Sequence, residues 1–173
     1  LKPDPIDRFE PPDGSRVREV FDYLGSEVFE KLAAHEQEFL LKTAILPDIS
    51  PELAAPLAQA GHSEEILSTL IRRNFFIERG LEPGAACRYH PLFRSFLLDR
   101  FAGRYPDPEA RRLRKKAGDL LVLAGRRDDA AGLYAEAGEW GRLAELIHEI
   151  APHRILQGRL GTVLAWIELL PAQ

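Results

Sequence analysis

The sequence predicts a mainly α-helical fold, in which a winged-helix domain at residues 15–105 is followed by antiparallel, tetratricopeptide-like helical repeats at residues 106–173. Three observations support this fold class. Apolar residues recur with helical spacing over most of the chain. Strand-like segments interrupt that spacing once, around residues 75–89. After residue 89, glycines separate short helical segments. Residues 1–14 hold several prolines among acidic side chains, which predicts a linker.

The first two helices are predicted from apolar spacing and caps. Asp13 or Ser15 caps a helix whose apolar residues continue to Leu32 with helical spacing. A second helix runs from Glu36 to Ile45 and ends before Pro47, because proline cannot continue a helix.

The third and fourth helices have clearer start signals. Ser50-Pro51 is a capping residue followed by proline at the first helical position, and this helix stops near Gly61. Ser63 caps the fourth helix, and Glu64-Glu65 in its first turn suit the positive end of the helix dipole. Its predicted apolar side consists of Ile66, Leu67, Leu70 and Ile71.

A short hairpin completes the first domain. Residues 75–78 and 86–89 read as two strands joined by a loop with Gly80, Pro83 and Gly84. Helices followed by a hairpin and a further helix are the layout of a winged helix. Pro91 begins that further helix, which ends before Tyr105-Pro106. Its predicted core residues are Leu92, Phe93, Phe96, Leu97 and Phe101.

A weak repeat follows, after a cap at Asp107-Pro108-Glu109. In each unit a glycine ends one helix and small or apolar residues mark the close packing of the next helix, as in stacked helix pairs. Because single repeats cannot bury their apolar faces, we expect more repeats beyond the C-terminal end. The units are Ala124-Gly125-Arg126 with Ala131 and Leu133, Ala137-Gly138-Glu139 with Ala144 and Leu146, and Gln157-Gly158-Arg159 with Leu164 and Ala165.

The composition is that of a soluble globular protein, since 45% of the 173 residues are hydrophobic and 29% are charged. This balance excludes disordered, collagen-like and disulfide-scaffold classes. Apolar stretches such as residues 120–124 are too short to span a membrane, so we expect no membrane partner. The single cysteine, Cys87, cannot form an internal disulfide and fits a reducing cytoplasm.

The chain begins at Leu1 and contains no methionine, so we expect it to be a piece of a larger protein. Its charge is unevenly distributed, with −8 over residues 1–71, +7 over residues 72–116 and −3 over residues 117–173. The basic middle segment predicts a face that meets a phosphate, a nucleic acid or an acidic neighbouring domain. Charge does not choose among these partners.

Several catalytic motifs are absent. The sequence lacks a P-loop, a dinucleotide-binding glycine motif, a serine nucleophile elbow and an H-E-x-x-H zinc motif, so we expect no enzyme active site within the chain. Cys87 and His90 lack the further ligands that zinc needs, and we expect no metal site. His148 and His153 are predicted to be surface or packing residues.

His90 is the candidate binding residue. It lies directly before a predicted helix start and has the basic neighbours Arg88 and Arg94, where backbone N–H groups and the helix dipole attract anions. It could therefore contact a phosphate. The alternative is a structural one, in which His90 caps the helix or packs against the hairpin.

Several segments occur together in an order that resembles a known family. They are Phe21-Asp22-Tyr23-Leu24, Glu27-Val28-Phe29, Phe39-Leu40-Leu41-Lys42-Thr43, Ile45-Leu46, Leu70-Ile71-Arg72-Arg73-Asn74-Phe75-Phe76, Tyr89-His90-Pro91-Leu92-Phe93 and Trp166-Ile167-Glu168-Leu169-Leu170-Pro171. Over about residues 13–171 the chain resembles the maltose-regulon-activator class of LuxR-family, ATP-dependent transcriptional regulators, which are STAND signal-transduction proteins.

The resemblance implies a domain order and a role for His90. Members of this class have a P-loop nucleotide-binding domain, a winged helix, a tetratricopeptide-like superhelix that senses an inducer, and often a DNA-binding helix-turn-helix. This chain matches the winged helix and the first helices of the sensor. His90 matches the histidine that contacts the phosphate of ADP bound with magnesium in the P-loop domain. Arginines expected to face that domain are Arg72, Arg73, Arg79, Arg88 and Arg94.

Under this hypothesis, the cofactors ADP and ATP bind outside the chain, and the partners are the P-loop domain, an inducer or regulatory protein at the repeats, and DNA through another domain. A second hypothesis is DNA binding by the winged helix itself, with residues 63–74 in the major groove. Glu64 and Glu65 argue against it, since carboxylates there would repel phosphates. A third hypothesis is a scaffold of helical repeats that binds a protein partner.

Overall fold

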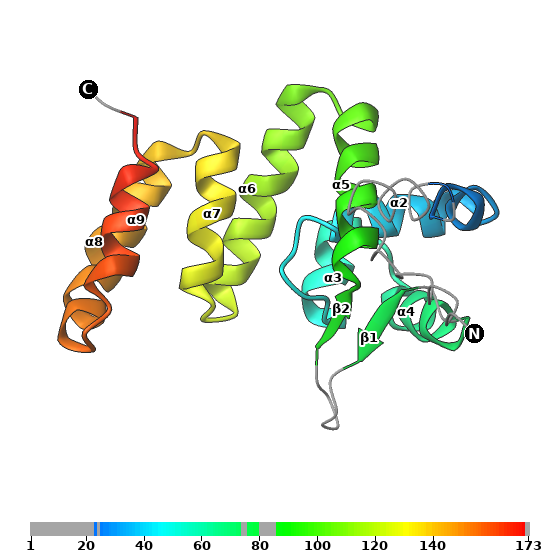
Figure 1. Cartoon of the computed structure of the whole chain (residues 1–173), viewed down its shortest axis with the longest axis horizontal. Helices are drawn as coiled ribbons and strands as arrows, with labels where there is room; N and C mark the ends of the chain where they lie inside the picture. Colours follow the sequence, from blue (N-terminus) through cyan, green and yellow to red (C-terminus); the bar gives the residue numbers. More distant parts are fainter. Residues whose placement is uncertain (1–22, 24, 74–75, 80–85, 172–173) are drawn as a thin grey trace, which may run out of the picture.

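Helices stand in an antiparallel row over the C-terminal part of the chain, and a small two-stranded sheet lies directly before that row (Figure 1). The structure, a computed structural model, describes residues 23, 25–73, 76–79 and 86–171. Residues 25–30 are helical and precede the elements with assigned bounds. These elements are α2 (Ala34–Thr43), α3 (Pro51–Ala58), α4 (Ser63–Arg72), β1 (Ile77–Arg79), β2 (Cys87–Tyr89), α5 (Pro91–Arg104), α6 (Asp107–Leu123), α7 (Arg127–Ala137), α8 (Trp140–Leu156) and α9 (Leu160–Glu168).

Helix α2 packs on α3 and α5, α4 packs on α3 and β1, and α6 to α9 stack beyond α5 (Figure 1). The two parts contact each other mainly where α3 packs on α6. A single hydrophobic core extends from Phe29 in the first helix to Trp166 in α9. The predicted winged helix followed by helical repeats is therefore confirmed. The predicted linker at 1–14 and the caps Asp13 and Ser15 lie outside the described residues.

The helix starts follow local chemistry, with some differences from the prediction. Helix α2 begins at Ala34, two residues before the predicted start at Glu36. The Glu36 carboxylate accepts a hydrogen bond from the Ala33 N–H at 3.0 Å, and so gives a partner to a backbone donor at the start of the helix. Helix α3 begins at Pro51 after Ser50, as predicted. Ser63 does not cap α4. It is the first helical residue, and its hydroxyl donates to the Ala60 carbonyl at 2.7 Å.

The start of α6 also differs by one residue. Pro106 occupies the capping position, so Asp107 and Pro108 form the first turn. The strands are close to the prediction, with β1 at Ile77–Arg79 and β2 at Cys87–Tyr89. The predicted loop between them falls outside the described residues.

The glycines of the repeat end their helices as predicted. Gly125, Gly138 and Gly158 have φ values of 75°, 72° and 74°, in the left-handed region that favours glycine. Ala131, Leu133 and Leu146 are buried as expected. The expected packing of Ala144, Leu164 and Ala165 is wrong, because all three are exposed.

The helical register explains this error. The buried residues of α8 are Leu143, Leu146, Ile147 and Ile150, which share one face at helical spacing. A residue one position away from Leu143 is rotated by about 100° and faces solvent. In α9 the buried residues are Val163 and Trp166, which leaves the two positions between them outside the interface.

Candidate functional site

The junction between β2 and α5 is held by strand pairing on both sides. Strand β1 pairs antiparallel with β2, with Ile77 opposite Tyr89. On the other side of β2, Ile49 exchanges two backbone hydrogen bonds with Cys87, at 2.7 and 2.9 Å. The His90 N–H then donates to the Phe76 carbonyl at 2.7 Å. The backbone immediately before α5 is thus fixed by both neighbours.

Two buried aromatic residues anchor the segment around His90. The Tyr89 hydroxyl lies 2.7 Å from the Thr43 hydroxyl oxygen in the core. Because the Thr43 hydroxyl donates to the Phe39 carbonyl at 2.7 Å, Tyr89 is the donor in the pair. Burial raises the pKa of Tyr89, and the hydrogen bond with Thr43 opposes that rise. The fully buried Phe93 ring lies 6.0 Å from the Tyr89 ring.

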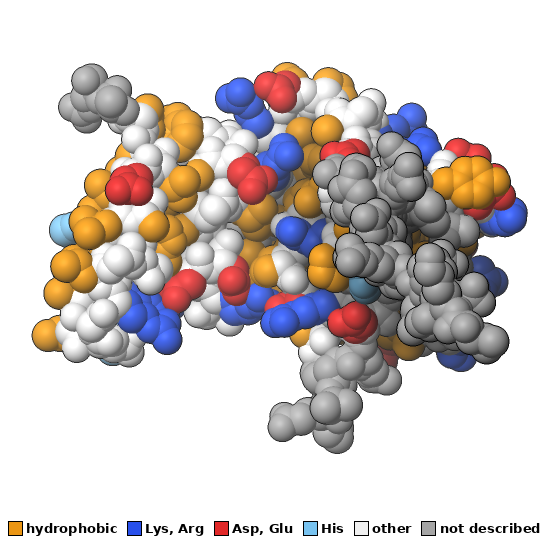
Figure 2. All heavy atoms as spheres, viewed as in Figure 1, with side chains coloured by type: hydrophobic (Ala, Val, Ile, Leu, Met, Phe, Trp, Pro, Cys, Tyr) orange, Lys and Arg blue, Asp and Glu red, His pale blue; other side chains and the backbone are white. Residues whose placement is uncertain are grey.

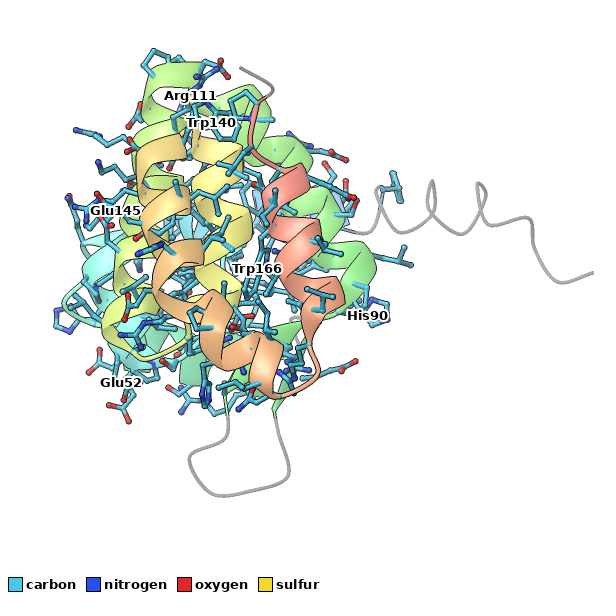
Figure 3. The ribbon with its side chains drawn as sticks, turned by 90° about the vertical axis from the view of Figure 1, so that its left-hand side faces the viewer. Glu52, His90, Arg111, Trp140, Glu145 and Trp166 are labelled. Carbon is cyan, nitrogen blue, oxygen red and sulfur yellow. The ribbon has the colours of Figure 1, made fainter. Side chains whose placement is uncertain are left out.

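His90 itself lies at the surface between these anchors. It occupies the capping position of α5, where its carbonyl, rather than its imidazole, serves the first helical turn by accepting the Arg94 N–H at 2.9 Å. The residue is half-buried. Figure 3 shows its side chain pointing away from the helices. A rigid backbone therefore presents this imidazole next to a helix N-terminus, a position suited to an anion.

The five candidate arginines lie in different surroundings. Arg72 is exposed at the end of α4 and donates to the Thr69 hydroxyl at 3.1 Å. Arg73 is exposed and lies 3.7 Å from the Glu36 carboxylate. Arg88 is exposed on β2. The predicted interface role of Arg79 concerns a side chain outside the described part of the structure.

Arg94 differs from the other arginines because it lies on the first turns of α5, four residues after His90. The residue is half-buried. Its Nε atom is buried and has no hydrogen-bond partner among the described residues. Arg88 and Arg94 thus lie two residues before and four residues after His90 in the sequence, while Arg72 and Arg73 lie at the end of α4.

The remaining histidines and the cysteine are spread over α2, the start of α4, β2 and α8. Within the described ranges, no group of three or more His, Cys, Asp or Glu residues could hold a metal ion. Cys87 is buried within β2. His35 and His62 line a pocket of about 480 Å³ between α2 and α4, where His62 lies 3.6 Å from Glu65. His148 and His153 are exposed, in agreement with the expectation of surface residues.

The first turn of α4 is acidic and faces solvent. Glu64 and Glu65 are both exposed there. In the DNA-binding hypothesis this end of α4 would enter a groove lined by phosphates. The geometry therefore keeps the two carboxylates where they oppose such binding.

The last two helices leave an apolar face uncovered. Figure 2 shows hydrophobic side chains gathered over α8 and α9. Leu160, Leu164 and Ile167 share one side of α9 at helical spacing and are about half exposed. Ile155 and Leu156 at the end of α8 and Leu169 after α9 are also exposed. Such a surface indicates an interaction site.

Comparison with known proteins identifies relatives of this winged helix. The sequence model of the MalT winged helix domain matches residues 25–109, which include α2 to α5. The winged helix of this chain is therefore similar to that of MalT. No helix in the part of the chain that the structure describes is long and apolar enough to cross a membrane.

The similarity to MalT extends beyond the winged helix. The chain is 32% identical over 158 residues to the HTH-type transcriptional regulator MalT of Klebsiella pneumoniae (strain 342), an alignment that covers 91% of this chain and 17% of that protein. It is 32% identical over 138 residues to MalT of Cronobacter sakazakii, covering 78% of this chain and 15% of that protein. The chain thus spans about a sixth of the length of these MalT proteins.

Sequence reasoning did not find every residue that builds the junction. Thr43 holds Tyr89 from 46 residues away, and Ile49 completes the pairing of β2. Thr43 reads as an ordinary helical residue in the sequence, and no local signal pairs it with a tyrosine in a distant strand. Only a family-wide comparison of covarying positions would have revealed such pairs.

Proposed function

We propose that the chain is the regulatory module of a MalT-like transcriptional regulator. Its winged helix couples the ADP or ATP state of a P-loop domain elsewhere in that regulator to inducer sensing by helical repeats. The proposal is supported by the match of residues 25–109 to the MalT winged helix domain and by the similarity to MalT over 91% of the chain. The direct packing of α3 on α6 supports coupling, since it joins the winged helix to the repeats.

The observation that carries the proposal is the position of His90. Its side chain projects from a backbone that strand pairing and two buried aromatic residues hold in place (Figure 3). In the resting state an imidazole N–H of His90 donates to a phosphate oxygen of ADP bound with magnesium in the P-loop domain. The helix dipole of α5 adds a favourable interaction with that negative charge.

The arginines then serve an interface. Arg88 and Arg94 flank His90 in sequence, and Arg72 is exposed at the end of α4. These cations complement an acidic face of the P-loop domain. Arg73 contributes less, because it already lies 3.7 Å from Glu36 within the winged helix.

The repeats provide the sensing end. The apolar face of α8 and α9 suits further helices of the superhelix, which together bind an inducer or a regulatory protein. DNA is contacted by a different domain, and the regulator acts in the cytoplasm. ADP keeps the winged helix closed on the P-loop domain, and inducer binding weakens that closure.

A transcription assay tests this proposal. In the regulator that contains this chain, His90→Ala should raise reporter transcription in the absence of inducer, because the closed state loses a phosphate contact. His148→Ala is a matched control, since His148 is exposed on α8 far along the chain from the junction. A His90→Ala regulator that still depends on inducer as strongly as wild type would overturn the proposal.

A further inference from the structure

A forked ion pair joins the repeats to the winged helix. Arg126 lies in the turn between α6 and α7, and its Nη1 and Nη2 atoms lie 2.5 and 2.9 Å from the two carboxylate oxygens of Asp48. Its Nε atom donates to Asp129 at 2.8 Å. Only 9% of the Asp48 side chain and 29% of the Arg126 side chain are exposed. This planar, two-bonded arrangement fixes direction as well as distance.

Asp48 is directly linked to the junction that presents His90. The next residue, Ile49, exchanges both backbone hydrogen bonds with Cys87 in β2. Cys87 is the first residue of β2, and His90 directly follows the last residue of that strand. A continuous path therefore runs from the Arg126 guanidinium through Asp48, the Ile49–Cys87 bridge and β2 to the His90 backbone.

The packing of α3 on α6 connects the two parts at a different place. Helix α3 packs on α6, and the Lys116 ammonium donates to the Pro56 carbonyl there. The forked pair contacts the loop between α2 and α3 at the C-terminal end of α6, where that helix turns into α7, whereas Lys116 lies near the middle of α6. Movement of the repeats about the α3–α6 contact would thus pull on Asp48.

We propose that the Asp48–Arg126 pair is a latch that transmits the position of the helical repeats to β2 and His90. When the Asp48–Arg126 pair is formed, it holds the Ile49–Cys87 bridge and the His90 backbone in the geometry described above. When a shift of the repeats separates the pair, the Asp48 carboxylate is left without its partner and the Ile49–Cys87 bridge loosens. The nucleotide end of this path rests on the proposed function, whereas the link itself is a property of this chain.

Hydrogen exchange of the 173-residue chain tests the link without nucleotide. Arg126→Gln should accelerate exchange of the Ile49 and Cys87 amides at least tenfold relative to the Leu97 amide in the core. Arg127→Gln is the matched control, because the neighbouring Arg127 pairs with Glu149 at 3.0 Å within the repeats. It should leave both amides within twofold of wild type. Equal acceleration of all three amides, or none, would overturn the latch.

A second variant separates the latch from a general loss of stability. Asp48→Asn should reproduce the exchange pattern of Arg126→Gln, and the double variant should add nothing further, since both changes open the same pair. If the two single effects instead add, the residues act independently and the latch is refuted.

Calorimetry with ADP on the longer regulator tests the nucleotide end. Arg126→Gln should change ADP affinity at least threefold in the wild-type background and leave it unchanged in a His90→Ala background. An equal change in both backgrounds would show that Arg126 acts by another route and would refute the latch. If His90→Ala alone has no effect on ADP affinity, the proposed function fails, and the exchange result still decides the link within this chain.

Discussion

Removal of the Tyr89 hydroxyl should destabilise the chain less than removal of its partner on Thr43. In Tyr89→Phe, Thr43 keeps its own bond to the Phe39 carbonyl at 2.7 Å and loses only the incoming donor. The lost hydrogen bond lowers the free energy of unfolding by about 1 kcal/mol. In Thr43→Val the buried Tyr89 hydroxyl remains without an acceptor, which costs about 1–3 kcal/mol.

The double variant distinguishes this account from simple additivity. With both hydroxyls gone, no polar group remains unsatisfied, so Tyr89→Phe/Thr43→Val should be more stable than Thr43→Val alone. Urea unfolding of the four proteins, followed by circular dichroism with a common slope, measures the order. A Thr43→Val variant that loses less stability than Tyr89→Phe, or a double variant whose loss equals the sum of the single losses, would refute the reasoning.

Two further predictions concern packing and pH. Gly118→Ala should lower the free energy of unfolding by about 1–3 kcal/mol, because the new Cβ would lie 2.8 Å from the Tyr134 ring. Gly132→Ala should raise the free energy of unfolding by about 0.5–1 kcal/mol, because its Cβ would have no atom within 4 Å and alanine is the better helix former. The opposite order of the two variants in urea unfolding would contradict this packing. Burial raises the pKa of both Tyr89 and Tyr134, so the unfolded chain releases these protons first, near pH 10. Stability should therefore be constant up to about pH 9 and fall above about pH 10, by up to ~1.4 kcal/mol per pH unit for each tyrosine. Tyr89→Phe should make that fall shallower in unfolding curves between about pH 8 and 11, and an identical slope would contradict the assignment.

Local signals in the sequence predicted the elements whose ends depend on neighbouring residues. The Ser50-Pro51 start of α3 and the three glycines that end α6, α7 and α8 needed only backbone preferences, and the structure has them at those residues. The exposure of Ala144 was predicted wrongly, because the buried face of a helix depends on which neighbour it packs against. Leu143 and Ala144 are neighbours in the sequence, but the side chain of Leu143 is buried and that of Ala144 is exposed to solvent.

The candidate site was predictable in part for the same reason. The place of His90 before α5 follows from the adjacent Pro91, and the structure has it at the capping position. The groups that hold it do not follow from local sequence, since Thr43 is 46 residues from Tyr89 and Asp48 is 78 residues from Arg126. Likewise, the pairing of Arg73 with Glu36 could not be inferred from a basic stretch of sequence.

ADP affinity of the regulator that contains this chain tests the central claim most directly. Isothermal titration in magnesium buffer would compare wild type with His90→Ala, and with His148→Ala as an exposed histidine control. The account predicts a loss of about tenfold in affinity for His90→Ala, equal to about 1.4 kcal/mol, and no change for the control. An unchanged affinity of His90→Ala for ADP would contradict the claim and would leave His90 as a structural residue at the start of α5.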